Sequence, residues 1–255
     1  MVPSLINIES RKYRGLGLYV LLFLMLCVHI IVIGVVAFER SFVKDIYPLF
    51  SLLDAYFLIQ LIFNPILLSS LVKKAVEIEE KNNMFQLQEM LGVEPSNLLF
   101  RKWSWLSLRL FVLQLIEWVL ILHMAARSSY FNFSQVASAR VAVIFFSQWL
   151  ITSAFVALFL ILDTRSKSPY FTLFFSMAGA LSGILSMLTS RTLTFINPFS
   201  WIISLLTISY VKGSEGFDRV INPVPWLSLA VSVAGLLICL FIIKRYTRIP
   251  PDKTI

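Results

Sequence analysis

The segment LGLYVLLFLMLCVHIIVIGVVAF, from Leu16 to Phe38, contains 23 residues and no Asp, Glu, Lys or Arg. At a helical rise of about 1.5 Å per residue, a helix of this length crosses the roughly 30 Å hydrocarbon layer of a bilayer. The apolar part is too long for the core of a signal peptide, and no small-residue cleavage site follows it. We therefore expect this segment to be a retained membrane span.

Five further apolar segments of spanning length follow the first: Ile46 to Val72, Trp103 to Ala126, Val141 to Leu162, Tyr170 to Ser190 and Val224 to Ile243. Of all 255 residues, 58% are hydrophobic and only 14% are charged. Soluble domains average about 45–50% apolar and about 25% charged residues, so the composition excludes an ordinary soluble domain. We expect a single all-α transmembrane domain over residues 1–255, with six transmembrane helices.

The connections between these spans differ in charge. If the N-terminus lies inside, the inner segments carry 14 Lys and Arg residues and the outer segments carry seven. Because basic residues are retained preferentially on the cytoplasmic side, both termini are expected to be cytoplasmic. The net charge of +8 is thus attributed to membrane topology and not to nucleic-acid binding.

Two segments outside the spans are expected to lie at the membrane surface. Residues 2–15 combine apolar and basic side chains, which suits either an N-terminal interfacial helix or a frayed basic tail. Thr192 to Val211 is uncharged and long enough to cross, but its crossing would move the C-terminal basic cluster outside. Since Asn197-Pro198 interrupts a helix near its start, we expect an outer re-entrant or interfacial helix before the last span.

A connection of 30 residues, Lys73 to Lys102, links the second and third spans and is too short to be a domain. Asn82-Asn83 is expected to end the preceding helix, and Gly92 to cap a short helix over Met84 to Leu91. One apolar stripe on this helix is formed by Met84, Leu87 and Leu91. Such a stripe either lies on the bilayer or docks into a groove of a partner protein.

The sequence lacks the common catalytic motifs. None of the nine glycines begins the phosphate-binding pattern G-x-x-x-x-G-K-[ST]. The two histidines are far apart and the two cysteines lie in apolar segments, so neither zinc-ligand spacing nor a disulfide framework is present. The Glu79-Glu80 pair lies in the connection outside the bilayer, which argues against an intramembrane protease. We expect no catalytic residues, no metal site and no cofactor held by this chain.

Polar residues inside the expected spans are candidates for a substrate path. A charged side chain at the centre of a membrane helix costs about 2.5–3.5 kcal/mol on insertion scales, so it usually faces protein or water. Asp54 and Glu117 would lie in the outer half of the membrane, where they could line a path for a cationic solute. Alternatively, they pair with Arg109 or a neighbouring amide or hydroxyl and hold helices together. The candidate path residues are Asp54, Gln60, Gln114, Glu117 and His123.

Gly179 and Gly183 in the fifth span form a G-x-x-x-G face. Small residues at this spacing allow two helices to approach closely. The face either packs against another helix of the same chain or joins two subunits.

Taken together, the order of elements resembles that of permease subunits of type 2 ABC exporters. The stretch EIEEKNNMFQLQEMLGVEPSNLLFRKW, Glu77 to Trp103, is similar to the acidic-then-Asn loop, short coupling helix and Lys/Arg re-entry of permeases in bacterial lantibiotic-type, antimicrobial-peptide immunity transporters. The stretch INPFSW, Ile196 to Trp201, is similar to the Asn-Pro-aromatic start of the re-entrant element. The resemblance covers nearly the whole chain as an architecture.

The resemblance implies a subunit of the bacterial cell membrane that exports amphipathic or antimicrobial peptides, or another substrate such as a drug or lipid-linked molecule. A dimeric ABC ATPase would bind ATP and Mg, and a second permease subunit, identical or homologous, would complete the membrane core. The residues that would couple to the ATPase are Glu77, Glu80, Asn82, Asn83, Met84, Phe85, Leu87, Leu91 and Gly92.

Two other classes of function stay open. A membrane-embedded hydrolase would require a polar catalytic constellation. A non-transport membrane subunit that sequesters or senses a ligand would be favoured if no ATPase purified with the chain.

Overall fold

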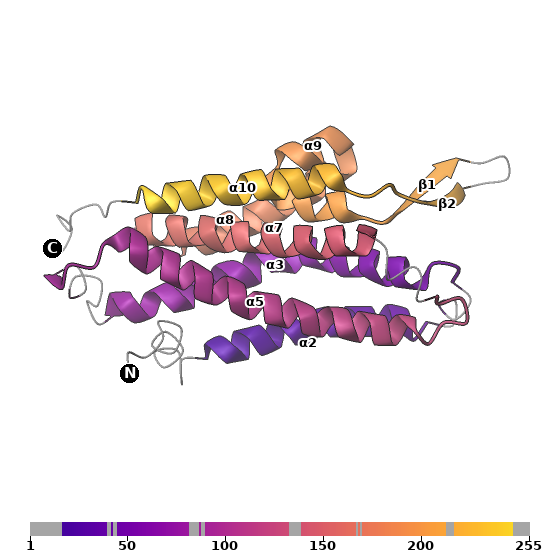
Figure 1. Cartoon of the computed structure of the whole chain (residues 1–255), viewed down its shortest axis with the longest axis horizontal. Coiled ribbons are helices and arrows are strands. Elements are labelled where there is room, and N and C mark those ends of the chain that lie inside the picture. Colours follow the sequence, from indigo (N-terminus) through magenta and orange to yellow (C-terminus); the bar gives the residue numbers. More distant parts are fainter. Residues whose placement is uncertain are drawn as a thin grey trace.

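A computed structural model describes residues 17–39, 42, 45–81, 87, 90–132, 139–166, 168, 170–212 and 217–246. In this part of the chain, six long helices run alongside one another in an elongated bundle (Figure 1). They are α2 (Leu18–Ala37), α3 (Pro48–Lys81), α5 (Pro95–Ala125), α7 (Ala139–Arg165), α8 (Phe171–Thr189) and α10 (Trp226–Lys244). Each is long and apolar enough to cross a membrane, so the chain has the features of a multi-pass membrane protein.

The six expected spans are all helical, but two helices are longer than the apolar segments predict. The second span was expected to end at Val72, whereas α3 continues to Lys81. The third was expected to begin at Trp103, whereas α5 begins at Pro95, with proline in the first turn, where its missing N–H costs nothing. Hydropathy detects only the part of a helix that suits lipid, and Lys, Glu and Ala extend α3 because they are good helix formers.

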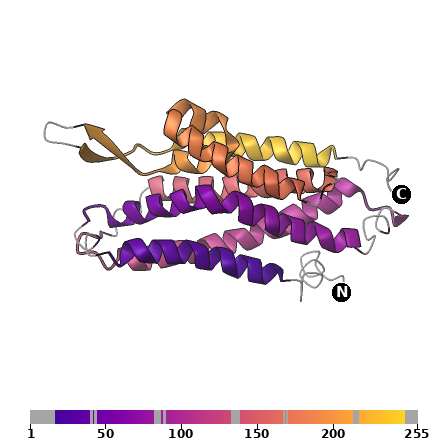
Figure 2. The same cartoon turned by 180° about the vertical axis from the view of Figure 1, so that it is seen from behind.

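The two ends of the bundle differ (Figures 1 and 2). The start of α2, the end of α3, the start of α5 and the end of α10 lie together at one end, here called the termini end. The opposite end carries a β-hairpin and the connection from α5 to α7, and is called the hairpin end. The expected N-terminal interfacial helix, and Asn82 to Gln86 of the expected coupling segment, lie outside the described residues.

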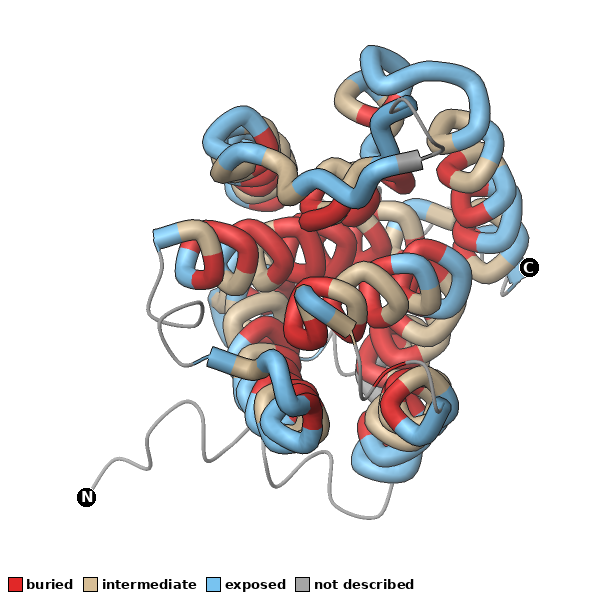
Figure 3. Tube along the Cα trace, turned by 90° about the vertical axis from the view of Figure 1, so that its right-hand side faces the viewer, coloured by how far each residue is buried: buried red, intermediate tan, exposed pale blue. Residues whose placement is uncertain are grey.

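The core of the bundle is built around α7, which packs against α3, α5 and α10. Seen from the hairpin end, buried residues gather at the centre and exposed residues cover the periphery (Figure 3). The outward side chains of α2 are apolar, among them Val20, Phe23 and Val35. An apolar outer surface of this kind suits a helix that faces lipid.

Between α8 and α10 the chain forms two short helices and not the single helix expected over Thr192 to Val211. They are α9 (Arg191–Ile196) and η2 (Pro198–Leu205), and the break between them falls at Asn197, as the Asn-Pro pair predicts. The Asn197 side chain accepts a hydrogen bond from Phe199 N (3.1 Å) and donates to Ser182 Oγ (3.1 Å) and Ser186 Oγ (2.9 Å) of α8. These contacts fix the turn against the bundle.

The two glycines of α8 are covered within the chain. A Cβ added at Gly179 would clash with three carbons of the ring of Phe199 in η2. A Cβ at Gly183 would lie 2.9 Å from the Phe199 carbonyl oxygen and 2.9 Å from Leu61 of α3. The glycine face therefore lets η2 and α3 approach α8 closely.

The structure also contains a two-stranded antiparallel hairpin, β1 (Ile208–Lys212) and β2 (Phe217–Ile221). The all-α prediction did not include these strands. Its register pairs Ile208 with Ile221 and Tyr210 with Arg219. The last residues of the expected re-entrant helix thus form a strand instead, because β-branched and aromatic residues such as Ile208, Tyr210 and Val211 favour extended backbone.

Candidate functional site

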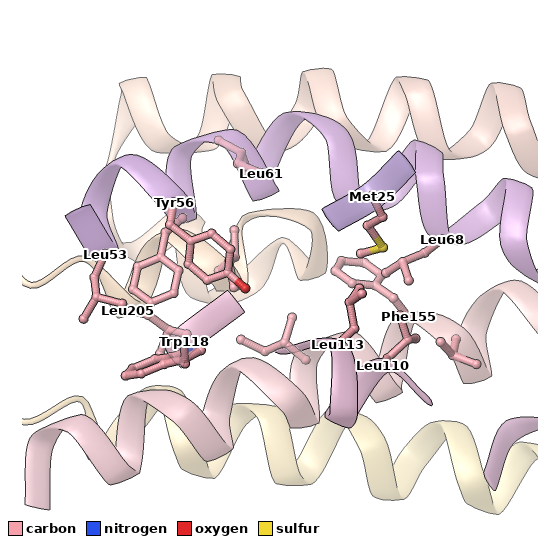
Figure 4. Close-up of a cluster of buried hydrophobic side chains, with 14 of the residues drawn as sticks. Met25, Leu53, Tyr56, Leu61, Leu68, Leu110, Leu113, Trp118, Phe155 and Leu205 are labelled. Carbon is pink, nitrogen blue, oxygen red and sulfur yellow. The ribbon is translucent and has the colours of Figure 1, made fainter. Parts of the chain in front are cut away.

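Six buried side chains from four helices form one polar network in the middle of the apolar core. They are His29 of α2, Tyr56 and Gln60 of α3, Glu117 and Trp118 of α5, and Gln148 of α7. None is more than 5% exposed. Tyr56 and Trp118 lie among leucine side chains, so the network is surrounded by hydrocarbon (Figure 4).

The hydrogen bonds of this network have a defined direction. The indole of Trp118 can only donate, and it donates to Gln148 Oε1 (2.8 Å). The amide nitrogen of Gln148 therefore faces the other way and donates to the Tyr56 hydroxyl (2.6 Å) and to Gln60 Oε1 (3.2 Å). The Tyr56 hydroxyl in turn donates to Glu117 Oε2. Each member thus fixes the orientation of the next.

The network ends at a buried pair of titratable groups. His29 Nδ1 lies 2.7 Å from Glu117 Oε1, a hydrogen bond between α2 and α5. The other ring nitrogen, Nε2, is buried and has no hydrogen-bond partner among the described residues. Because a polar group in hydrocarbon is costly unless it is hydrogen-bonded, this contact stabilises both side chains in the core.

The network attaches α2 to the rest of the bundle. Within α2, which is described throughout, the buried residues are Leu18, Leu22, Met25, His29, Ile33 and Ala37. His29 is the polar member of this stripe. Dispersion contacts alone define the position of an apolar helix poorly in lipid, whereas a polar pair fixes its register. Glu117 is therefore placed to hold α2 in one position.

Asp54 has a different role in the structure. Its Oδ1 accepts hydrogen bonds from Thr207 N (2.6 Å) and Thr207 Oγ1 (2.7 Å), and its Oδ2 accepts one from Ile208 N (3.0 Å). Charge-assisted bonds to backbone N–H groups are stronger than those between neutral groups. Asp54 thereby ties the base of the β-hairpin to α3.

A cavity of about 950 Å³ opens at the hairpin end, between α2, α3, α8 and the hairpin. Its volume is in the range of known ligand pockets. Among the described lining residues, the charged ones are Glu39, Asp45, Asp54, Asp218 and Arg219. The apolar walls include Val36, Phe42, Ile46, Leu58, Met187 and Ile208. The cavity thus combines apolar walls with an excess of acidic groups.

One ion pair crosses this cavity. Arg219 of β2 donates through Nη1 to Asp45 Oδ1 (3.1 Å) and through Nη2 to Ser51 Oγ (3.2 Å). Burial lowers the pKa of Arg219, but the Asp45 carboxylate and Tyr210 outweigh that effect, and its pKa lies above the ordinary value. The Arg219 side chain is still 40% exposed. Solvent at the exposed guanidinium screens this ion pair, which is therefore weaker than a fully buried one.

The structure separates the residues that the sequence groups as a substrate path. Asp54 lines the cavity, whereas Gln60 and Glu117 belong to the buried network. Gln114 donates to the Phe145 carbonyl oxygen (2.8 Å) and joins α5 to α7. His123 is exposed near the end of α5.

Arg109 does not contribute to either site, because it lies over the ring of Trp105 on its own helix, 5.3 Å from the ring centroid.

Several residues of both sites had no signal in the sequence. Tyr56 and Gln148 are isolated polar groups in apolar segments, 92 positions apart. Asp45 and Arg219 lie 174 positions apart. Only the folded bundle brings these side chains together.

No protein-family model, no curated protein and no solved structure matches this chain.

Proposed function

We propose that the chain is the transmembrane subunit of an ATP-driven exporter of the type 2 ABC class. It would remove amphipathic antimicrobial peptides from a bacterial cell membrane, with ATP hydrolysed by a separate subunit. The order of elements supports this proposal: two helices, a connection with a short apolar stripe, three helices, a broken element at Asn197-Pro198 and a last helix.

The observation that carries the proposal is the shape of the termini end. At about 1.5 Å per residue, α3 with 34 residues and α5 with 31 residues are about 51 Å and 46 Å long, well beyond the roughly 30 Å of a bilayer core. Their connection presents Leu87, Met90 and Leu91, which are all exposed. Gly92 follows with φ of 79°, the left-handed conformation that ends helices. This end therefore offers an apolar platform to a partner.

The two extended helices are held to each other and to the bundle. Lys102 of α5 is buried, and its Nζ donates to the Ala75 carbonyl oxygen of α3 (3.0 Å). Trp103 donates from Nε1 to the Ser153 carbonyl oxygen of α7 (3.0 Å). A force applied to the platform would reach three helices at once.

The distribution of charge in the sequence supports a cytoplasmic position for this platform. In the sequence, the connections that would lie inside together with both termini carry 14 of the 22 Lys and Arg residues, and basic connections are retained in the cytoplasm. ATP is cytoplasmic, so an ATPase would meet Leu87 and Leu91 there. The hairpin-end cavity, with its acidic groups and apolar walls, would face outward and suits a cationic amphipathic substrate.

The proposal is tested with proteoliposomes that contain this chain, purified with its ATPase. Leu87→Asp together with Leu91→Asp should abolish peptide-stimulated ATP hydrolysis, because unpaired carboxylates are costly to bury in an apolar groove. Asn97→Asp is the control, since it adds a carboxylate at an exposed polar position of the same end.

Three outcomes would contradict the proposal. One is that no ATPase purifies with the chain, which would favour a subunit that senses or sequesters a ligand. Another is that the Leu87/Leu91 variant retains full stimulation. The third is stimulation by drugs or lipid-linked molecules but not by peptides, which would keep the exporter and change its substrate.

A further inference from the structure

We propose that the hairpin-end cavity contains a binding site for the cationic group of a ligand. In this structure the protein's own Arg219 side chain fills that site. This cation site consists of Asp45, Ser51 and Tyr210 at the edge of the hairpin-end cavity. The ligand would carry a guanidinium or alkylammonium group on an apolar body. The inference deepens the proposed function and rests on it for its biological meaning, but ligand binding can be measured without an ATPase.

The cation site has the composition that recognises a guanidinium. Asp45 supplies a carboxylate oxygen and Ser51 a hydroxyl, 3.1 and 3.2 Å from the two terminal nitrogens of Arg219. The ring centroid of Tyr210 lies 5.8 Å from the guanidinium carbon, within the range of a cation–π contact. A guanidinium or ammonium group of a ligand could make the same three contacts.

The site is formed independently of Arg219. Asp45 Oδ1 accepts a hydrogen bond from Tyr47 N (3.0 Å), and Asp45 Oδ2 accepts one from Ser51 Oγ (2.6 Å). Ser51 lies in the first turn of α3 and Tyr47 directly precedes that helix, so the carboxylate keeps its orientation when Arg219 leaves. The Asp45 side chain is only 10% exposed, which shields it from bulk water and strengthens its attraction for a cation.

Arg219 can leave without unfolding the hairpin. The base of the hairpin is fixed by Asp54, which binds Thr207 and Ile208, and by Asn222, whose N and Nδ2 donate to Thr207 O and Leu206 O at 2.8 Å each. None of these contacts involves Arg219. An internal group that is 40% exposed and weakly held is suited to being displaced.

The cavity around the cation site suits the rest of such a ligand. Glu39 and Asp218 add two further carboxylates to its lining, so displacing Arg219 leaves a strongly acidic pocket among the described residues. Next to these groups lie the apolar side chains of Val36, Leu58 and Met187. A ligand with a cationic group and an apolar body would contact both surfaces.

The test measures binding of a fluorescent amphipathic peptide to the purified chain in nanodiscs, with empty nanodiscs to subtract lipid partitioning. The probe contains arginine, and its matched counterpart contains citrulline, which has the same shape without the charge. Arg219→Gln should bind the arginine peptide about fivefold more tightly, because an internal competitor is removed. Asp45→Asn should weaken that binding about tenfold, and neither variant should change binding of the citrulline peptide.

Lys212→Gln is the control, because it removes the same charge from the hairpin at a residue that does not line the cavity. Unchanged affinity of Arg219→Gln for the arginine peptide would overturn the inference. So would equal gains in Arg219→Gln and Lys212→Gln, which would indicate a general effect of charge. If Asp45→Asn misfolds, Ser51→Ala provides a milder variant with the same expected direction. A failure of ATPase coupling would leave these binding results unaffected, so the two proposals can fail separately.

Discussion

Tyr56→Phe removes a single oxygen atom from the centre of the polar network and leaves the aromatic ring in place. The hydroxyl makes two hydrogen bonds to other helices: it donates to Glu117 of α5 and accepts from Gln148 of α7. Interhelical hydrogen bonds in membrane proteins average about 0.6 kcal/mol and reach about 1.7 kcal/mol. Two such bonds, one of them to a carboxylate, predict a loss of about 1–3 kcal/mol in the free energy of unfolding.

This loss is measurable by reversible unfolding in mixed micelles, with helix content followed by circular dichroism. The matched control is Tyr19→Phe, because Tyr19 is 43% exposed on the outer surface of α2. That control should change the free energy of unfolding by less than about 0.5 kcal/mol. A double-mutant cycle of Tyr56→Phe with Glu117→Gln should give a coupling energy of about 0.5–2 kcal/mol. Equal stability of Tyr56→Phe and Tyr19→Phe would refute the assignment of this network as the polar connection between helices.

Three further predictions concern other parts of the fold. Gly179→Ala should lower the free energy of unfolding by about 1–3 kcal/mol, because the ring it would meet is held by neighbouring aromatic side chains. Gly34→Ala, which meets no atom within 4 Å, should leave stability unchanged or slightly higher; equal effects of the two would contradict the packing argument. Asp54→Asn should speed amide hydrogen exchange at the base of the hairpin, and unchanged exchange would disprove its anchoring role. With the native cysteines removed, an impermeant thiol reagent should label cysteine at Lys212 but not at Lys244 in intact cells; labelling of both would contradict cytoplasmic termini.

The helices of the bundle could be predicted because lipid imposes a length and a composition on each span. Their bounds could not, because a helix does not end where lipid ends. The segment up to Lys81 continues α3 because its residues are good helix formers and because Ala75 and Val76 are still buried, and Pro95 begins α5 eight residues before the apolar segment at Trp103. The sequence does not predict the hairpin, because Ile208 to Val211 is as apolar as the segment that it ends. The strand that pairs with it contains Arg219 and lies beyond that segment.

The sites were less predictable than the helices. Glu117 and His29 stand out as ionisable residues in spans, but a uniformly apolar helix gives no sign of which side faces inward. Their pairing, 88 positions apart, depends on how α2 lies against α5. Asp54 is also an ionisable residue in a span, but its partners are mainly backbone N–H groups. Every residue except proline has such a group, so the sequence does not indicate which ones Asp54 binds. Asp45 and Arg219 lie in connections, where charge is ordinary.

The length of α3 has a mechanical consequence. Asp54 and Lys81 belong to the same helix, about 40 Å apart along its axis, and no loop separates them. A tilt imposed at Lys81 would therefore be carried along the helix to the hairpin base, which the hydrogen bonds of Asp54 hold to α3. Pro65 lies between them and lacks the N–H that would bond to the turn before it, so bending would concentrate there. The helix is thus a rigid connection with one flexible point at Pro65. Replacing Pro65 with a helix-forming residue would change how closely the motion at Asp54 follows the motion at Lys81.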